Sequence, residues 1–283
     1  MHFVERDPPL TEQRLGVRAE GAGIGGVDGH DLHDALQSIV AGSVKTEAVV
    51  LRTIRYGEAD RVLHLYTRDR GRVAAMAKGV RRTRTRFGGR LEPYFRIAVV
   101  LYEGRSELLT VTSAETVDPH ARLRADAHAL DAAGRACDAV ARLFETAEPH
   151  PAVYHLLCNE LALLDRGAGG PESAATRANQ LAFRLKLLLA AGLAPQLTAC
   201  ASCGAREHLT GFSGAAGGVV CSACEASAFP LSAEAHAFMA EALGRALADA
   251  PAAGERALRQ VERAIGEIAE HHAATRLRAS ARS

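Results

Sequence analysis

The sequence predicts an α+β chain with a small N-terminal β-barrel, a helical domain after it, and a cysteine-rich module inserted in the helical part. Three observations predict this fold. Short apolar runs separated by turn residues fill positions 44–118, helical spacing of apolar residues begins after Pro119, and two C-x2-C pairs interrupt the helical part. At 283 residues the chain has room for about two domains of roughly 150 residues.

The barrel is predicted from five runs rich in β-branched and aromatic residues, with turn residues such as Tyr56-Gly57-Glu58 between them. The runs are 48–54, 62–66, 73–77, 97–102 and 108–112. Five strands in so short a segment, with no long helical pattern, indicate a closed barrel. The OB-fold is the commonest barrel of this size, and an SH3-like barrel is the alternative that the pattern leaves open.

The helical part is predicted from apolar residues at three- and four-residue spacing. The expected helices cover 123–144, 153–164, 174–191, 232–248 and 255–272. Cys137 and Cys158 fall on apolar helix faces, which predicts that both are core residues. The expected organisation is an extension at 1–43, a barrel at 44–118, a helical domain at 119–283 and a cysteine module at 198–228 within it.

The first 43 residues differ in character from the rest of the chain. They combine Pro8-Pro9 and a glycine-rich stretch with a net charge of −4, which predicts a disordered extension or a start codon placed too far upstream. The segment Gly21–Gly26 matches G-x-G-x-x-G, the dinucleotide fingerprint. No apolar strand precedes it, so the phosphate-binding interpretation is disfavoured.

The formal charge of +1 conceals a basic segment, because residues 44–118 carry fifteen Lys and Arg against nine Asp and Glu. The run from Gly71 to Leu91 contains no acid. Its seven cations are Arg72, Lys78, Arg81, Arg82, Arg84, Arg86 and Arg90. In an extended conformation the alternating arginines project on one side, and the interleaved Thr83, Thr85 and Phe87 suit phosphate hydrogen bonding and one stacking contact. The run predicts a nucleic-acid-binding surface.

The pairs Cys200/Cys203 and Cys221/Cys224 are separated by seventeen residues. Two C-x2-C knuckles at this spacing predict four thiolates around one Zn²⁺, as in zinc ribbons. Two disulfides or redox-active pairs are the alternatives. Four protein ligands leave no open position, so the expected zinc is structural. A zinc deaminase is excluded because the chain has no H-x-E motif.

Targeting and catalytic signals are missing from the sequence. The N-terminus lacks a secretory signal, and the longest apolar run, Leu181–Leu193, is interrupted by Arg184 and Lys186. We therefore expect a soluble, cytoplasmic chain without a membrane partner. No G-x-S-x-G, Walker loop or H-E-x-x-H is present, and we expect a binding protein rather than an enzyme.

Several local motifs resemble those of the RecO family of bacterial recombination mediators. They are Ala48–Leu51, Gly57–Arg61, Thr67 with Gly71, Ala77–Arg82 and the basic tail Arg276–Ser280. The Gly-Glu-Ala-Asp-Arg turn and the Ala-Lys-Gly-x-Arg-Arg run are the most specific. The resemblance extends from Val44 to the end of the chain, and residues 1–43 have no counterpart in it.

The resemblance implies a nucleoid-associated protein of recombinational repair, in the RecF pathway. Such a protein binds single- and double-stranded DNA and anneals complementary strands. Together with RecR, it helps RecA replace single-stranded-DNA-binding protein (SSB). It also recognises the acidic C-terminal tail of SSB. By family position the phosphate contacts are Lys78, Arg81, Arg82, Arg84 and Arg86. The alternative function is a zinc-ribbon transcription regulator or another nucleic-acid-processing factor.

Overall fold

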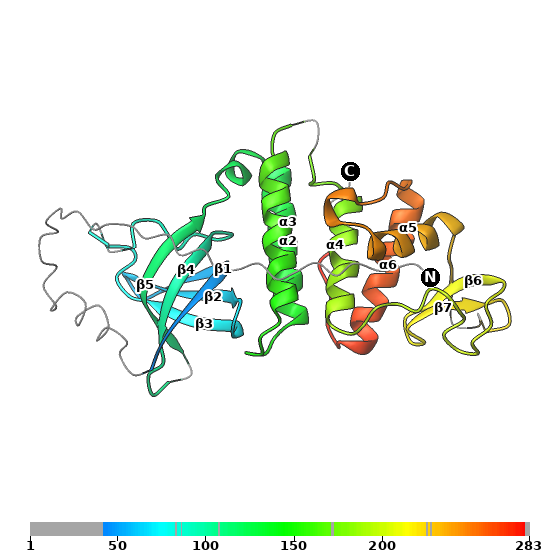
Figure 1. Ribbon diagram of the computed structural model, residues 1–283, viewed down its shortest axis with the longest axis horizontal. Helices are drawn as coiled ribbons and strands as arrows, with labels where there is room; N and C mark the ends of the chain where they lie inside the picture. Colours follow the sequence, from blue (N-terminus) through cyan, green and yellow to red (C-terminus); the bar gives the residue numbers. More distant parts are fainter. Residues whose placement is uncertain are drawn as a thin grey trace, which may run out of the picture. The chain divides into compact units, whose positions relative to one another are not determined.

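The computed structural model describes residues 42–82, 84–85, 87–106, 108–170, 173–224, 226 and 228–280. Five strands come first, helices follow, and a small three-stranded sheet is inserted between the third and fourth α-helices of this part of the chain (Figure 1). The predicted fold class is confirmed. The expectations for an extension and for the Gly21–Gly26 segment concern residues outside the described part.

The five N-terminal strands form a closed barrel in the order β1-β2-β3-β5-β4. Their bounds are β1 Ser43–Tyr56, β2 Asp60–Thr67, β3 Gly71–Ala77, β4 Arg96–Tyr102 and β5 Leu109–Asp118. All neighbours are antiparallel except β3 and β5, which pair in parallel at Ala75–Leu109 and Met76–Thr110. Each strand matches a predicted run, and closure leaves the barrel without a free sheet edge.

The barrel core is built from alternate residues of the strands, as the two-residue period of a strand requires. Leu63 and Leu65 of β2 and Ala75 and Ala77 of β3 are fully buried. Phe87, from the connection between β3 and β4, is in the same core cluster. One end of the barrel is therefore filled by a connecting segment rather than by a strand.

The helical part follows the predicted helices with two differences. It contains a 3-10 turn η1 (Ala121–Ala125), helices α2 (Ala127–Leu143), α3 (Pro151–Gly167), α4 (Arg177–Ala190) and α5 (Ala233–Gly244), a 3-10 turn η3 (Leu247–Asp249) and α6 (Glu255–His272). The first expected helix is divided at Asp126, whose carboxylate accepts the backbone N–H groups of His128 and Ala129 and so caps α2. The helix expected to reach Ala248 ends at Gly244.

The barrel and the first two helices share a packed boundary. Tyr66 of β2 is fully buried and meets Phe144 edge to face at 6.3 Å between ring centroids. The Tyr154 hydroxyl of α3 donates to Glu47 Oε2 of β1 at 3.1 Å. Gly71 has a positive φ of 59°, and a Cβ there would collide with the carbonyl oxygen of Glu148, so only glycine fits.

Within the described residues, no helix has the length and apolar character needed to cross a membrane. Cys137 and Cys158 are buried in the helical core, which confirms the interpretation of both as core residues. Burial raises the pKa of both thiols. These two cysteines therefore stay protonated and contribute packing.

Candidate nucleic-acid interface and metal centre

The connection between β3 and β4 carries most of the predicted DNA-binding residues, and we call residues 78–90 the cation loop. Lys78, Arg81, Arg82 and Arg84 are exposed. None of these four side chains forms an ion pair or hydrogen bond with another described residue. Since an unpaired cation at the surface keeps its full charge for an incoming anion, the loop concentrates positive potential at this end of the barrel.

The cation loop is held in place by backbone contacts to the turn between β1 and β2. The N–H of Arg81 donates to the carbonyl of Ala59 at 3.0 Å, and the N–H of Gly79 donates to Asp60 Oδ1 at 2.8 Å. At its other end Phe87 is buried at 1% exposure in the barrel core. The loop is therefore anchored at both ends, while its described cationic side chains face solvent.

Two expectations about this loop are wrong. Residues 78–81 form turns and the chain bends at Arg82 and Arg84, so these two arginines do not project from one side by strand alternation. Phe87 is not available for stacking, because its ring fills the barrel core instead of facing solvent. The position of Phe87 among arginines predicts an exposed ring, whereas closure of the barrel buries it.

The remaining predicted residues are placed differently. Arg90 is exposed and lies in the cation loop, and Arg86 lies outside the described residues. Arg72 is on β3 at the helical boundary, where its Nη1 donates to the carbonyl of Ala141 in α2 at 2.9 Å. The structure therefore brings five described cations together in the loop and separates Arg72 from them.

Two exposed apolar side chains beside the cation loop were missed by the sequence argument. Tyr56 and Ile54, at the end of β1, are 59% and 46% exposed. Residues two apart in a strand share a face, and Ile54 pairs with Val62, which in turn pairs with Met76. Met76 is two residues before Lys78, so this apolar row ends next to the cation loop. The Tyr-Gly-Glu pattern predicts the turn, but it carries no signal that the tyrosine ring is exposed.

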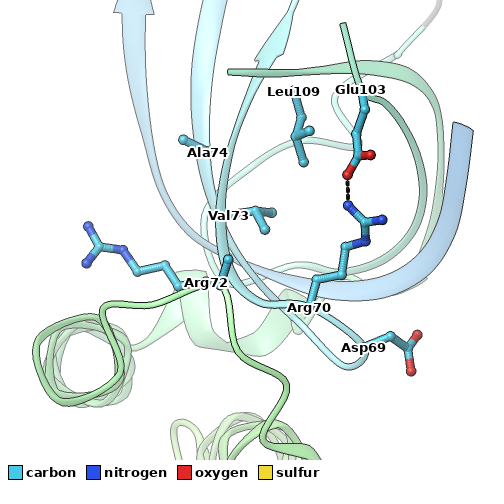
Figure 2. Close-up of a pocket in the computed structure, with 8 residues that line it drawn as sticks. Asp69, Arg70, Arg72, Val73, Ala74, Glu103 and Leu109 are labelled. Atoms are coloured by element: carbon cyan, nitrogen blue, oxygen red, sulfur yellow. Dashed lines mark hydrogen bonds and ion pairs between the residues drawn. The ribbon is translucent and has the colours of Figure 1, made fainter. Parts of the chain in front are cut away.

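A pocket on another side of the barrel has mixed charge. It is lined by Asp69, Arg70, Val73, Glu103 and Leu109 among others, where β3 meets β5 (Figure 2). Arg70 forms an ion pair with Glu103 at its edge, and the Arg72 side chain points away from Arg70. Since Arg70 is already paired and Asp69 adds a negative charge, this pocket is a poorer anion site than the cation loop.

The four predicted zinc ligands do converge in space. The sulfur atoms of Cys200, Cys203, Cys221 and Cys224 all lie within 4.8 Å of one another, and none forms a disulfide. Cys203 Sγ and Cys221 Sγ are 3.7 Å apart. Tetrahedral zinc with Zn–S bonds of about 2.3 Å requires S–S separations of about 3.8 Å. The thiol cluster therefore fits a four-coordinate metal ion.

The backbone around the cluster favours the thiolate form of Cys200. N–H groups of Cys221, Cys203 and Ser202 point at the Cys200 sulfur and lower the pKa of this thiol to about 6. The cysteines lie on a module of strands β6 (Leu209–Ser213), β7 (Gly218–Cys221) and β8 (Phe229–Pro230). With all four positions supplied by protein, the cluster can hold a structural ion and leaves no place for substrate.

The cysteine module packs against α6. Gly214 N donates to Glu267 Oε2 at 3.1 Å, and a ring nitrogen of His272 lies 2.7 Å from the Gly214 carbonyl oxygen. A Cβ at Gly214 would collide with Glu267, so glycine permits this close approach. Arg263 covers the Phe229 ring at 4.2 Å. The module is thus fastened to the helical core by α6.

The fold and the two sites together define a class of architecture: a closed five-stranded barrel with a cationic loop, joined to a helical domain that carries a four-thiol module. Two family models match the chain, Recombination protein O N terminal at residues 41–120 and Recombination protein O C terminal at residues 124–281. The chain belongs to the RecO family.

Relatives support this assignment at substantial identity. The chain is 38% identical over 248 residues to the DNA repair protein RecO of Anaeromyxobacter sp. (strain K), covering 83% of this chain and 94% of the relative. It is 43% identical over 184 residues to the DNA repair protein RecO of Bifidobacterium adolescentis, covering 62% of this chain and 72% of the relative. It is 39% identical over 188 residues to the protein of the same name from Rubrobacter xylanophilus, covering 66% and 73%.

Proposed function

We propose that the protein is a non-catalytic DNA-binding factor of recombinational repair. The observation that supports it most directly is the cation loop, in which Lys78, Arg81, Arg82 and Arg84 are exposed and have no described acidic partner. Guanidinium groups fork onto phosphate oxygens, and a rigidly anchored loop loses little entropy when it does so. Arg90 and Arg86 are further candidates for the same surface, and Arg72 is a candidate for a separate phosphate contact.

The mechanism we propose is electrostatic and stoichiometric. The cation loop holds the backbone of one strand, and the exposed ring of Tyr56 stacks on a neighbouring base. The other bases stay free to pair, so a complementary strand held by the same protein can anneal. No covalent bond changes, and no nucleotide or catalytic metal is required for this step.

Family membership supports the partners that we propose. The names of the relatives place them in DNA repair. For this chain we propose single- and double-stranded DNA, RecR and the acidic C-terminal tail of SSB as direct partners, with RecA loaded indirectly. These interactions make the protein a mediator that exchanges SSB for RecA on single-stranded DNA. A cytoplasmic, nucleoid-associated location fits this role.

The DNA-binding proposal is tested by changing Lys78, Arg81, Arg82 and Arg84 to Ala and titrating labelled single-stranded DNA over a salt series. Loss of four phosphate contacts should weaken binding about 100-fold at low salt and reduce the slope of log K against log salt by about 3. A matched control removes four exposed cations without described partners elsewhere, Arg105, Arg166, Arg206 and Arg256. If both variants bind like the parent, the cation loop is not the interface.

Annealing of SSB-coated complementary strands separates the mediator from the alternative regulator. The parent protein should accelerate annealing, and the loop variant should not. A sequence-specific regulator would instead protect a defined duplex site in a footprint and leave annealing unchanged. A footprint with little sequence preference supports the mediator, because phosphate contacts carry no sequence information.

We also propose that the four-thiol cluster holds one structural Zn²⁺. Native mass spectrometry should find one zinc per chain, and Cys200→Ser with Cys221→Ser should abolish it. Cys137→Ser is the matched control, since this buried thiol lies outside the cluster. A protein purified without reductant that carries two disulfides and no metal would contradict this proposal.

A further inference from the structure

A pocket of about 380 Å³ lies where β1, β3, α2 and the C-terminal segment meet. Four arginines line it, one from each of these four parts of the chain: Arg52, Arg72, Arg142 and Arg278. Asp138 and Glu145 also line it, and Arg142 Nε pairs with Asp138 Oδ2 at 2.7 Å. Two positive charges remain after the two acids are counted, so the pocket favours an anion.

Two of the arginines are well placed to receive a ligand. Arg52 is exposed, and its only described side-chain contact is with a ring nitrogen of His64 at 3.4 Å. Arg278 is held through its backbone, whose carbonyl accepts from Arg184 Nη2 at 2.6 Å, while its side chain is exposed. Burial together with the charges of Arg52 and Arg72 lowers the pKa of His64. Arg52 and Arg72 therefore lie close enough to the same imidazole for both charges to act on it.

The pocket lies on the same outer face of the barrel as the apolar row. Arg52 is two residues before Ile54 on β1, and its cross-strand partner His64 is two residues after Val62. Along β3 the face runs from Lys78 at the cation loop to Arg72 at the pocket. Six residues of strand span about 20 Å. The face therefore has cations at both ends and exposed apolar side chains between them.

We infer that this pocket binds a backbone phosphate of single-stranded DNA. The cation loop holds a neighbouring segment of the same DNA strand, so that the DNA runs along the outer face of β1–β3. The inference rests on the proposed function and adds a second phosphate site and a path. A phosphodiester fits better than an acidic peptide because the face leading to the pocket offers the Tyr56 ring, on which a base can stack, and the apolar side chain of Ile54, against which a base can pack. The spacing also suits single-strand sites of about 4–16 nucleotides per barrel.

The test compares Arg52→Ala/Arg278→Ala with a control of equal charge, Arg105→Ala/Arg256→Ala. Neither pair removes a described ion pair. With a labelled oligothymidylate, the pocket variant should bind about tenfold more weakly and lose about 1.4 from the salt slope, the value for two single-strand phosphates. The control should match the parent. Equal binding by the pocket variant and the control overturns the inference.

The two proposals fail in different ways. If the pocket variant binds normally while the cation-loop variant is impaired, only the second phosphate site is wrong. If neither variant is impaired, the proposed function itself is wrong. Loss of binding to an acidic oligoaspartate peptide, with DNA binding intact, would assign the pocket to a peptide and overturn the inference.

A second measurement needs no substitution. Phenylglyoxal modifies accessible guanidinium groups, and mass spectrometry locates the modified residues. In the unaltered full chain, single-stranded DNA should reduce labelling of Arg52 and Arg278 by at least about half, and leave Arg105 and Arg256 unchanged. Labelling of Arg52 and Arg278 that is the same with and without DNA overturns the inference.

Discussion

The described arginines of the cation loop and those of α4 differ in burial and in pairing. Arg81, Arg82 and Arg84 are exposed and have no described partner. Arg177 and Arg184 are 7% and 3% exposed. Arg177 pairs with Glu255 and Glu262 of α6, and Glu262 also accepts from the Ser280 hydroxyl at 2.7 Å. One set is available to an external anion, and the other joins two helices and the C-terminal segment.

These two sets of arginines show that the number of charges does not predict function. A buried charge must be paired, so its removal damages the fold. An exposed, unpaired charge contributes little to folding and remains free for binding. We therefore expect substitutions in the buried set to lower stability and substitutions in the exposed set to lower DNA affinity.

Removing the buried cation should have the largest effect on stability. Arg177→Ala leaves the 3.6 Å contact to Arg184 as the remaining described ion pair of Glu262, and we expect a loss of about 3 kcal/mol in the free energy of unfolding. Urea denaturation measures it, and Arg256→Ala, an exposed arginine of α6, is the control. DNA affinity of the folded variant should stay at the parent value. A loss below about 0.5 kcal/mol would remove the distinction between the two sets.

The buried carboxylate Glu160 extends the comparison to pH. Glu160 of α3 is fully buried, and burial raises its pKa to about 8 although Asn179 donates to both carboxylate oxygens at 3.0 Å. The folded state therefore holds a proton that the unfolded chain releases near its ordinary pKa of 4.5. This group's contribution to stability is full below that pH and declines as pH rises toward 8, by at most about 1.4 kcal/mol per pH unit.

Glu160→Gln removes this titration while keeping the side-chain shape. The stability of the variant relative to the parent should rise from pH 5 to pH 8 and then level off, because Gln is neutral throughout. Unfolding free energies at four or five pH values measure the difference. A difference that does not change with pH would show that the Glu160 side chain reaches solvent in the folded protein.

Tyr56 should have an intermediate effect, on binding alone. Tyr56→Ala removes a ring that is 59% exposed, and we expect the affinity for single-stranded DNA to fall by about 1–2 kcal/mol, with less effect on duplex DNA. Stability should change by less than about 0.5 kcal/mol. Tyr102→Ala, which removes another exposed ring from the barrel, is the control. An equal loss of affinity in both variants would argue against stacking at Tyr56.

The smallest effect is expected at an exposed ion pair. Arg245 Nη2 and Glu241 Oε2 are 2.7 Å apart, and both side chains are about half exposed. Arg245→Ala should lower stability by about 0.3 kcal/mol, and the loss should disappear at high salt. Thermal unfolding at two salt concentrations measures it. A loss comparable to that of Arg177→Ala would show that pairing matters more than burial.

Local sequence patterns predicted much of the fold. The five apolar runs predicted the five barrel strands, and residues 255–272 coincide with α6. These predictions succeed because the period of apolar residues reflects which face of an element is buried. The end of α5 and the break at Asp126 were not predicted, since caps and 3-10 turns depend on a few local contacts.

The candidate sites were only partly predictable. The C-x2-C spacing predicted the four-thiol cluster because two short knuckles bring each pair of sulfurs together locally. The acid-free run predicted a cationic surface, but its members separate in space, because Arg72 contacts α2 and Phe87 lies in the barrel core. The exposed ring beside the cations is that of Tyr56, which lies in β1, outside the run.

Local sequence patterns were sufficient for the kinds of element, their order, the metal-ligand spacing and the excess of positive charge in the barrel. Which described cations lack a partner, which aromatic ring faces solvent, and which arginines line one pocket between β1, β3, α2 and the C-terminal segment became visible only in the tertiary structure. The two kinds of property depend on residues at different separations along the chain. Periodicity and spacing are local properties of a chain, whereas burial and pairing depend on residues that are distant in sequence and meet only when the barrel closes against the helices.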